Sequence, residues 1–286
     1  MLVTTASILE SLRRSLASLT PAEKKVARTL IAHYPAAGLA GVVQLASRAD
    51  TSTATVTRLV QKLGFEGFAS FHAALLVELA SREAGPRDRL NTLPRPGKGS
   101  LATLSLALAE AVASISTAIP ASEYDATVKL LGNPSRRIIM GGGRVSQAWA
   151  ELFATYLTRL RRDVSVFSRD PGRRIASLLD VNTKTVVVLF DFRRYDQNTV
   201  RIAVEARRRH ATVILITDHW LSPAASSADV VLPVPVEVPS PFDTGVTSMA
   251  LVECLTWSVT QDLGASGESR MKDWDAINSL SVLPGH

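Results

Sequence analysis

Apolar residues in the first 80 positions recur every three or four residues, which is the spacing of amphipathic helices. The segment TPAEKKVARTLIAHYP begins with Thr20, Pro21 and Glu23, which form a capping box with proline in the first helical turn. Pro35 ends this pattern, because proline does not continue a helix. We therefore expect the first part of the chain to be an all-helical domain.

After residue 135 the pattern changes to short apolar, β-branched runs that alternate with helical stretches. Continuous apolar strands separated by helices are typical of a parallel sheet that is covered on both faces. Five such strands predict a flavodoxin-like, doubly wound α/β domain, whose ligands bind at the carboxyl ends of the strands. The expected strands are 136–140, 163–167, 184–190, 211–217 and 228–234.

Proline, glycine and charged residues dominate the segment 81–100, SREAGPRDRLNTLPRPGKGS, which has almost no apolar periodicity. Such a composition is typical of a linker. We therefore expect a helical domain at 1–80, a linker at 81–100 and an α/β domain at 101–286. The predicted fold class is α+α/β, with a five-stranded parallel sheet in the second domain.

The stretch 100–120, SLATLSLALAEAVASISTAIP, carries one charge and has the hydropathy of a membrane span. Its large apolar residues nevertheless follow steps of three and four, while Ser, Thr and Ala occupy the other face. We expect a helix that packs within the protein or in a dimer, and no membrane partner. The predicted apolar face consists of Leu101, Leu104, Leu108, Val112, Ile115 and Ile119.

Two short helical patterns around a tight turn predict a helix-turn-helix in residues 42–65, VVQLASRADTSTATVTRLVQKLGF. Ser52 is placed to cap the second helix and Gly64 to end it. Small and hydroxyl side chains on its polar face admit base edges, while Arg and Lys reach guanine or phosphate. The alternative is a helical hairpin with a solvated polar face. The predicted DNA-binding residues are Ser52, Thr53, Thr55, Thr57, Arg58, Gln61 and Lys62.

Composition and charge are compatible with a nucleic-acid partner. The 286 residues carry a net charge of +6 and the sequence pI is about 9.8, which favours an acidic partner. The single cysteine, Cys254, excludes an intrachain disulfide and fits a reducing cytoplasm, and its apolar neighbours predict that it is buried. The five histidines show no metal-ligand spacing, so we expect neither a metal nor a cofactor.

Together these segments resemble the RpiR family of bacterial transcriptional regulators, which join an N-terminal helix-turn-helix domain to a C-terminal sugar-isomerase (SIS) domain. The resemblance covers residues 15–265, and TVTRLVQKLGFEGFASF is its most distinctive part, because the glycines and phenylalanines from Gly64 to Phe68 match the family pattern. It implies a cytoplasmic regulator that binds double-stranded DNA. Asp50 departs from the family's glycine, so the turn should form at some energetic cost.

The resemblance implies a sugar-phosphate site on two loops, and both depart from the family pattern. The first family loop, G-x-G-x-S, follows the first strand, and here GGGRV has Val145 at the serine position with Ser146 next to it. The second family loop, S-x-S-G-x-T, follows the third strand. The phosphate-binding hydroxyls of both motifs are therefore replaced. The positions of the second loop hold Asp191, Arg193, Arg194 and Asp196 in place of Ser, Ser, Gly and Thr.

The altered third-strand loop, LFDFRRYDQ, has two interpretations. Its arginines could bind a small anion through forked donors, with backbone N–H groups of GGGR assisting, although Asp191 would repel an ordinary hexose phosphate. Alternatively, an internal ion pair between Asp191 and an arginine holds the loop shut, or the loop packs against a second subunit. The predicted ligand-binding residues are Gly141, Gly143, Arg144, Ser146, Asp191, Arg193, Arg194 and Ser240.

Two further loops follow the fourth and fifth strands. In TDHWLSP, His219 and Trp220 could touch a ligand, and Trp220 is expected to pack instead. The segment PSPFDTG precedes the last helix, and we expect Asp243 or Thr244 to cap that helix. The same segment could also line the ligand site, because it follows a strand of the sheet.

The function predicted from these features is a DNA-binding regulator whose SIS domain forms a homodimer or homotetramer and senses a small anionic metabolite. A symmetric assembly would place two recognition helices on a near-palindromic site. A sugar-phosphate isomerase is the alternative, but catalysis needs acid–base residues within hydrogen-bond reach of the substrate, and we expect no catalytic residues here. A third hypothesis is a regulator whose SIS half serves only for assembly.

Overall fold

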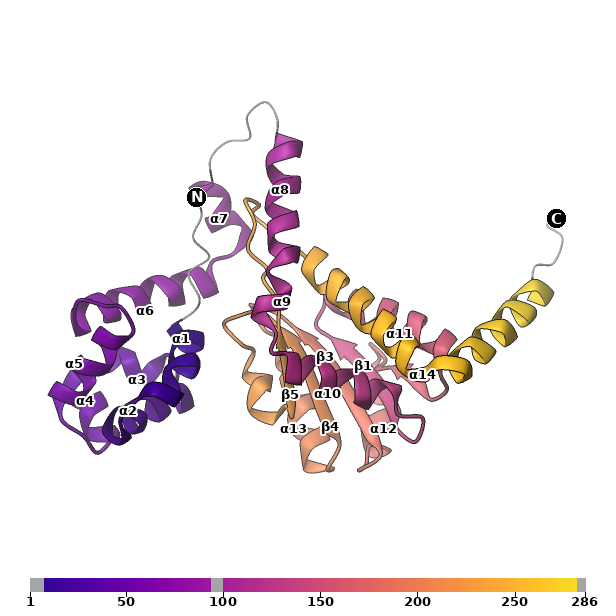
Figure 1. The fold of residues 1–286 in the computed structure, drawn as a ribbon, viewed down its shortest axis with the longest axis horizontal. Coiled ribbons are helices and arrows are strands. Elements are labelled where there is room, and N and C mark those ends of the chain that lie inside the picture. The colour runs from indigo at the N-terminus through magenta and orange to yellow at the C-terminus, as the bar shows by residue number, and fades with distance from the viewer. Residues whose placement is uncertain (1–7, 94–99, 282–286) are drawn as a thin grey trace. The chain divides into compact units, whose positions relative to one another are not determined.

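A computed structural model of the chain describes residues 8–93 and 100–281 (Figure 1). It divides into two compact units, an N-terminal unit, Met1–Asp88, and a C-terminal unit, Arg89–His286. The N-terminal unit is helical and the C-terminal unit contains a sheet with helices. The predicted fold class, α+α/β, is confirmed.

The N-terminal unit is built from short helices around one apolar core. Thr20 caps α2 as predicted: its side chain accepts a hydrogen bond from the Glu23 backbone N–H, and the Glu23 carboxylate accepts one from the Thr20 N–H at 2.9 Å. Leu30, Leu45 and Phe71 are among the fully buried side chains of this core. The elements are α1 (Ile8–Ser15), η1 (Leu16–Ser18), α2 (Pro21–Ala32), α3 (Ala36–Leu39), α4 (Val42–Arg48), α5 (Thr53–Lys62) and α6 (Phe68–Glu83).

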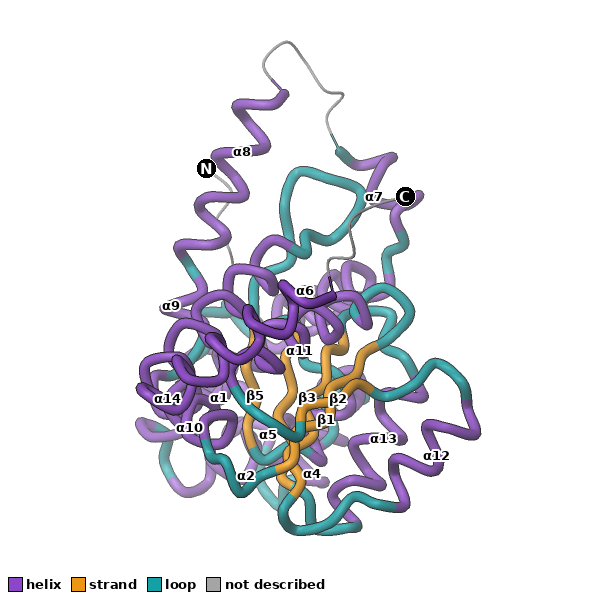
Figure 2. The backbone as a smooth tube through the Cα atoms, turned by 90° about the vertical axis from the view of Figure 1, so that its right-hand side faces the viewer, coloured by secondary structure: helices purple, strands orange, loops and turns teal. Residues whose placement is uncertain are grey.

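The C-terminal unit contains five parallel strands in the order β2-β1-β3-β4-β5, which is the flavodoxin-like order. The strands of this sheet are drawn in orange in Figure 2. All five predicted strands are present, and their ends agree with the prediction to within two residues. The order reverses between β1 and β3, so a topological switch point lies there. The strands are β1 (Arg137–Gly142), β2 (Val164–Val166), β3 (Thr185–Asp191), β4 (Thr212–Thr217) and β5 (Val230–Pro233).

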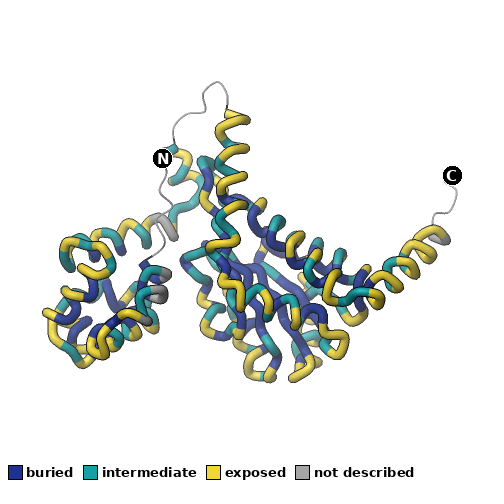
Figure 3. Tube along the Cα trace, viewed as in Figure 1, coloured by how far each residue is buried: buried dark blue, intermediate teal, exposed yellow. Residues whose placement is uncertain are grey.

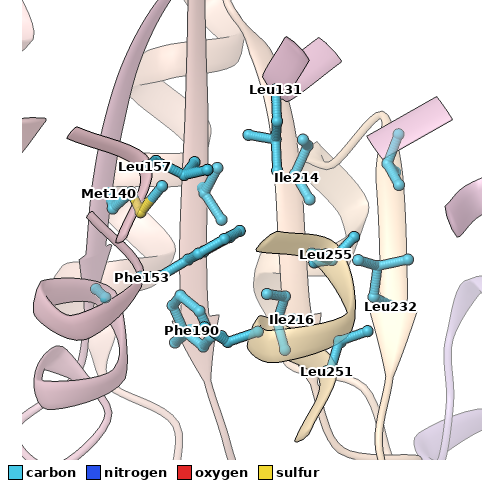
Figure 4. Close-up of a cluster of buried hydrophobic side chains, with 14 of the residues drawn as sticks. Leu131, Met140, Phe153, Leu157, Phe190, Ile214, Ile216, Leu232, Leu251 and Leu255 are labelled. Atoms are coloured by element: carbon cyan, nitrogen blue, oxygen red, sulfur yellow. The ribbon is translucent and has the colours of Figure 1, made fainter. Parts of the chain in front are cut away.

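Helices cover both faces of this sheet. Successive strand residues point to opposite sides, and the residues on both sides are apolar and buried. On one face Met140, Phe190 and Ile216 pack against α10, α11 and α14 (Figure 4). On the other face Val187 and Leu189 pack against α13 and η2. The remaining elements are α8 (Ser100–Ala113), α9 (Ile115–Ala118), α10 (Ala121–Gly132), α11 (Gln147–Leu160), α12 (Pro171–Leu179), α13 (Gln197–Arg208), η2 (Pro223–Ser227) and α14 (Val246–Ser281).

The segment predicted to be a linker is more helical than expected. It contains the end of α6 and a further helix, α7 (Pro86–Thr92), and only 94–99 lies outside the described residues. Proline in the first turn favours this helix, and the Asp88 carboxylate accepts a hydrogen bond from the Gly85 N–H at 3.0 Å. The composition of the segment therefore did not predict this short, capped helix.

The predicted helix 100–120 forms as α8 and α9, and its side chains are largely exposed (Figure 3). Of the described residues, only the stretch Ser100–Ala118 is long and apolar enough to cross a membrane. Most of the predicted face is half-buried, but Leu101 is 83% exposed, and Leu106, outside that face, is 66% exposed. The burial predicted for Cys254 was wrong, because it lies on the exposed side of α14.

Candidate functional site

Helices α4 and α5 form the predicted helix-turn-helix. Val56, Leu59 and Val60 of α5 are buried in the core of the N-terminal unit. The opposite face of α5 is open, because Thr53, Ala54, Arg58 and Gln61 are exposed and Thr57 is half-buried. The Arg58 guanidinium lies along the helix, where its Nε donates to the Ala54 carbonyl at 3.4 Å. This face is a candidate DNA-reading surface.

Ser52 and Thr55, two of the predicted DNA contacts, form hydrogen bonds with each other at the start of α5. The Ser52 hydroxyl caps the helix by accepting a hydrogen bond from the Thr55 N–H at 3.2 Å. The Thr55 hydroxyl lies 3.0 Å from the Ser52 hydroxyl, and Thr55 is buried. Ser52 itself is exposed. The prediction for Thr55 is therefore corrected, because its side chain faces the protein.

The predicted contact Lys62 is engaged within the protein. Its ammonium lies 2.7 Å from the carboxylate of Glu23, a side chain that is 5% exposed. The hydrogen bond from Lys62 lowers the pKa of Glu23 to about 2, against the opposing effect of burial. Glu23 is also the capping residue of α2, so this pair holds α5 against α2. Lys62 therefore has a structural role, and its contact with DNA stays a prediction.

The turn between α4 and α5 has the backbone conformation that the sequence implied. Asp50 has φ of +48°, in the left-handed region that glycine occupies more readily. Its carboxylate accepts a hydrogen bond from the Lys25 ammonium at 2.8 Å, and this lowers the pKa of Asp50. The ion pair is exposed on both sides, so it offsets little of the conformational cost.

The loops after β1 and β3 meet at the switch point of the sheet. The Ser146 hydroxyl donates to the Phe190 carbonyl of β3 at 2.7 Å and accepts from the Gly143 N–H at 2.9 Å. A Cβ at Gly143 would lie 3.2 Å from the Asp196 side chain. A side chain at Gly143 would therefore be crowded where the two loops approach each other. The Ser146 hydroxyl is consumed by this connection, so its predicted contact with a ligand is corrected.

The backbone donors of the first loop that remain without a protein acceptor overlap the predicted stretch, 141–144, only at Arg144. The Gly142 N–H donates to the Gln147 side chain at 3.0 Å, and that of Gly143 is also used. Gly141 belongs to β1, where a Cβ would meet Phe167 at 3.0 Å. Among the described residues, the N–H groups of 144–146 donate to no protein acceptor. They precede α11, where helix geometry favours an anion.

Asp191, at the end of β3, is a buried connector. Its carboxylate accepts hydrogen bonds from the Ser222 hydroxyl and from the Asp196 N–H, the latter at 3.0 Å. Only 2% of the residue is exposed, and burial raises the pKa of Asp191 to about 6. The expected pair between Asp191 and an arginine is wrong, because the carboxylate is bonded to the loops after β3 and β4.

Arg193 forms the internal ion pair of this loop, with a partner that the sequence did not indicate. Its Nε donates to the Asp243 carboxylate at 2.6 Å, and its Nη2 bonds the second oxygen of the same group. The guanidinium stacks on the ring of Trp220 at 4.4 Å and is 3% exposed. Arg193 is therefore occupied by the protein, and its predicted role as an anion partner is corrected.

The backbone of the same loop is fixed by a second buried acid. The Asp218 carboxylate accepts from the Arg193 N–H at 2.6 Å and from the Tyr195 hydroxyl at 2.8 Å. Burial raises the pKa of Asp218 to about 6. The neighbouring His219 has its pKa lowered to about 4, by burial and then by the Arg193 charge. At neutral pH this imidazole is uncharged and offers no charge to an anion.

Arg194 differs from Arg193 in both exposure and backbone. Its side chain is exposed, and the residue has φ of +57°, a conformation that non-glycine residues adopt at a cost. The resemblance to the family places glycine at this position, so arginine here carries a conformational cost that glycine would not. Arg144 is also exposed, at the end of the first loop. Among the described residues, neither Arg144 nor Arg194 forms an ion pair with an acidic side chain.

The loop after β5 is held by contacts at both of its ends. The Thr244 hydroxyl accepts from the Val246 N–H at 3.1 Å, so Thr244 caps α14 as one of the two predicted residues. Asp243 instead accepts from Arg193 and from Arg89, the latter at 2.6 Å. The Ser240 hydroxyl accepts from the Phe242 N–H at 3.2 Å, which fixes the loop itself.

Metal-ligating side chains and surface cavities are two further features of the chain. The described residues contain no group of three or more His, Cys, Asp and Glu side chains that could hold a metal. A surface cavity of about 340 Å³ is lined by α14 alone, not by the strand-end loops. Its lining residues are Arg270, Asp273, Trp274, Ile277 and Asn278.

Comparison with known proteins identifies both halves of the chain. Residues 6–82 match the helix-turn-helix domain of the rpiR family, and residues 133–258 match the SIS domain. An uncharacterised HTH-type transcriptional regulator from Haemophilus influenzae is 26% identical over 219 residues, 75% of each chain. A second such regulator, from Caldanaerobacter subterraneus, is 23% identical over 223 residues, 78% of each chain.

Two solved structures share the fold. The sugar isomerase domain of an RpiR transcription factor from Sphaerobacter thermophilus is 18% identical, with a TM-score of 0.58 over 63% of this chain and 99% of that one. The Vibrio vulnificus NanR protein complexed with ManNAc-6P is 18% identical, with a TM-score of 0.55 over 97% of this chain and 100% of that one. With its helix-turn-helix and SIS domains in the family's order, the chain belongs to the RpiR family of transcriptional regulators.

Proposed function

We propose that this regulator binds an operator through α5 and responds to a small anion at the carboxyl ends of β1 and β3, without catalysing a reaction. The observation that carries the proposal is the convergence of two loops at the switch point. There the backbone N–H groups of 144–146 and the guanidinia of Arg144 and Arg194 are available to a ligand. All of these groups are donors, so the surface favours negative charge.

The structure of the N-terminal unit supports the DNA-binding half of the proposal. The exposed face of α5 carries Thr53, Thr57, Arg58 and Gln61, whose side chains are short, hydroxylic or hydrogen-bonding. Such side chains on the second helix of a helix-turn-helix contact base edges in the major groove. Ser52 is exposed at the start of the helix, where it faces a phosphate group more readily than a base.

The chemistry of the site favours recognition of charge over recognition of a sugar. Val145 is 73% exposed where the family has serine, and the Ser146 hydroxyl is engaged with β3. The solved relative from Vibrio vulnificus binds ManNAc-6P, so a phosphorylated acyl-amino sugar is one candidate. Because the hydroxyl donors are replaced, we expect the anionic group to supply most of the affinity and an ordinary hexose phosphate to bind weakly.

Titration calorimetry on the full chain tests the anion site. The probes are inorganic phosphate, ManNAc-6P, an ordinary hexose 6-phosphate and a dicarboxylate. Arg144→Ala and Arg194→Gly should each weaken binding about tenfold, because a charged hydrogen bond contributes roughly 1.5–3 kcal/mol. Arg194→Gly should keep the fold, since glycine adopts φ of +57° without strain.

The matched control is Arg162→Ala. Arg162 is exposed and precedes β2, so it lies at the amino end of the sheet, opposite the proposed site. Its replacement changes the net charge equally and should leave anion affinity unchanged. Binding of every probe with unchanged affinity in the Arg144 and Arg194 variants would refute the site. Conversion of a bound sugar phosphate to its isomer would refute the non-catalytic role.

Assembly is the remaining part of the proposal. The exposed apolar helix α8 supports a homodimer or homotetramer, because large exposed apolar residues mark association surfaces. Such an assembly would place two copies of α5 on a near-palindromic operator. A cytoplasmic location follows from this function, since the operator is on the chromosome.

A further inference from the structure

The carboxylate of Asp243 is shared by two arginines from distant parts of the chain. Arg193 binds both of its oxygens from the loop after β3. Arg89, on α7, binds one of the same oxygens with its Nη1 at 2.6 Å, and its Nη2 donates to the Val238 carbonyl at 3.4 Å. One acidic side chain therefore joins the loop of the proposed anion site to α7.

Helix α7 has a special place in the chain. It starts at Pro86, within the last residues of the N-terminal unit, and Arg89 is the first residue of the C-terminal unit. The DNA-binding unit is thus connected to the sheet through this helix. A contact that holds α7 in place therefore affects the segment of chain that joins the two units.

The three side chains form a partly buried cluster, so solvent and salt screen their charges less than those of exposed ion pairs. Exposure is 3% for Arg193, 15% for Arg89 and 27% for Asp243. Asp243 lies in a loop that is closed by the Thr244 N–H, which donates to the Val236 carbonyl at 2.9 Å. A shift of Asp243 therefore moves the loop that also carries the second acceptor of Arg89.

We propose that Asp243 couples the anion site to the DNA-binding unit: an anion bound at Arg194 shifts the loop after β3, which also carries Arg193, and so alters the hold of Asp243 on Arg89 and α7. This inference rests on the anion site proposed above. The coupling is reciprocal, so operator DNA changes the affinity for the anion by the same factor as the anion changes the affinity for DNA.

The experiment uses the full-length chain, inorganic phosphate as the probe and a duplex selected by the wild-type protein from random sequences. Hydrogen exchange of α7 is measured with and without phosphate, and duplex affinity is measured in parallel. In the wild type, phosphate should increase the exchange of α7 several-fold and shift duplex affinity by about fivefold or more, the usual range of allosteric coupling. Arg89→Gln should bind phosphate as before, and phosphate should then change neither readout.

Two variants make the result specific. Arg87→Gln removes the same charge from the same helix at an exposed position and should retain full coupling. Arg89→Lys restores a cation opposite Asp243 and should recover part of the coupling. Arg89→Gln is preferred to Asp243→Asn, because loss of the acid leaves the buried Arg193 without its main partner and endangers folding.

The outcomes separate the two proposals. If Arg89→Gln binds phosphate and retains the wild-type response, the coupling through Asp243 is wrong while the anion site stands. A wild-type protein that binds phosphate without any response of α7 or of DNA affinity also refutes the coupling. If the wild type binds none of the anions, the proposed site fails and the coupling fails with it.

Discussion

Replacement of Asp191 by asparagine should stabilise the C-terminal unit at neutral pH. Burial raises the pKa of Asp191 from 3.8 to about 6, so the folded protein holds this proton more tightly than the unfolded chain. The interval of about 2.2 pH units, at about 1.4 kcal/mol each, corresponds to about 3 kcal/mol. Asparagine is neutral, keeps an oxygen for the Asp196 N–H, and can bond the Ser222 hydroxyl.

The sign of the pH dependence follows from the raised pKa. Asp191 contributes fully to stability below the unfolded value of 3.8, and this contribution is lost as the pH rises through about 6. The variant should therefore match the wild type near pH 4 and exceed it by up to about 3 kcal/mol near pH 8. The figure is an upper value, because the nearby acid Asp218 titrates over the same range and shares protons with Asp191.

Urea unfolding followed by tryptophan fluorescence is a suitable assay, because all four tryptophans lie in the C-terminal unit. Asp180→Asn is the matched control, since Asp180 is an exposed aspartate of the same unit that ends α12. Its replacement removes an exposed carboxylate from the same unit, so any effect of losing one negative charge alone appears in both variants. If the Asp191→Asn variant is less stable than the wild type at pH 8, or if their difference in unfolding free energy is independent of pH, then burial does not raise the pKa of Asp191 as described.

Three other predictions concern α5 and α8. Arg58→Ala should weaken operator binding by roughly 1–3 kcal/mol if it reads a base edge, and equal loss on random duplex would assign it to phosphate contact instead. Lys62→Met should lower the stability of the N-terminal unit by about 1 kcal/mol, seen as faster hydrogen exchange in α5. This difference should disappear as the pH falls through about 2, where Glu23 is protonated. Leu101→Glu with Leu106→Glu should shift the oligomer to monomer in light scattering, with full stability of the fold; an unchanged mass would exclude α8 from the interface.

The sheet could be predicted from the sequence because its signal is local. All seven residues of β3 are buried, and such a strand appears as an uninterrupted apolar run between polar segments. The capping box of Thr20 and the cap of Ser52 are equally local, since each side chain bonds a backbone group three residues away. Element type and order follow from such signals. Strand order followed from the sequence only through the doubly wound fold class.

The partners of the charged side chains could not be predicted in the same way. Arg193 and Asp243 are 50 residues apart, and Lys62 and Glu23 are 39 residues apart. Each pair is set by how helices and loops pack, and many other acids were available to both cations. Because Arg193 and Arg194 are adjacent in the sequence, the same role was predicted for both, but Arg193 is buried and Arg194 is exposed. The left-handed backbone of Arg194 turns its side chain to the surface while Arg193 is buried.

The altered loops keep a defined geometry because the replaced groups take structural roles. Asp191 and Arg193 occupy positions where the family has serines, and both are now bonded inside the protein. The donors that face outward are backbone N–H groups and two exposed guanidinia, which recognise charge and bidentate geometry but not the pattern of hydroxyls on a sugar ring. Selectivity among sugars must then come from other contacts or be low. We expect the proposed anion site to distinguish anions by charge and size, and the Arg193 loop beside it is bonded through Asp243 to Arg89 of α7, the helix that follows the DNA-binding unit.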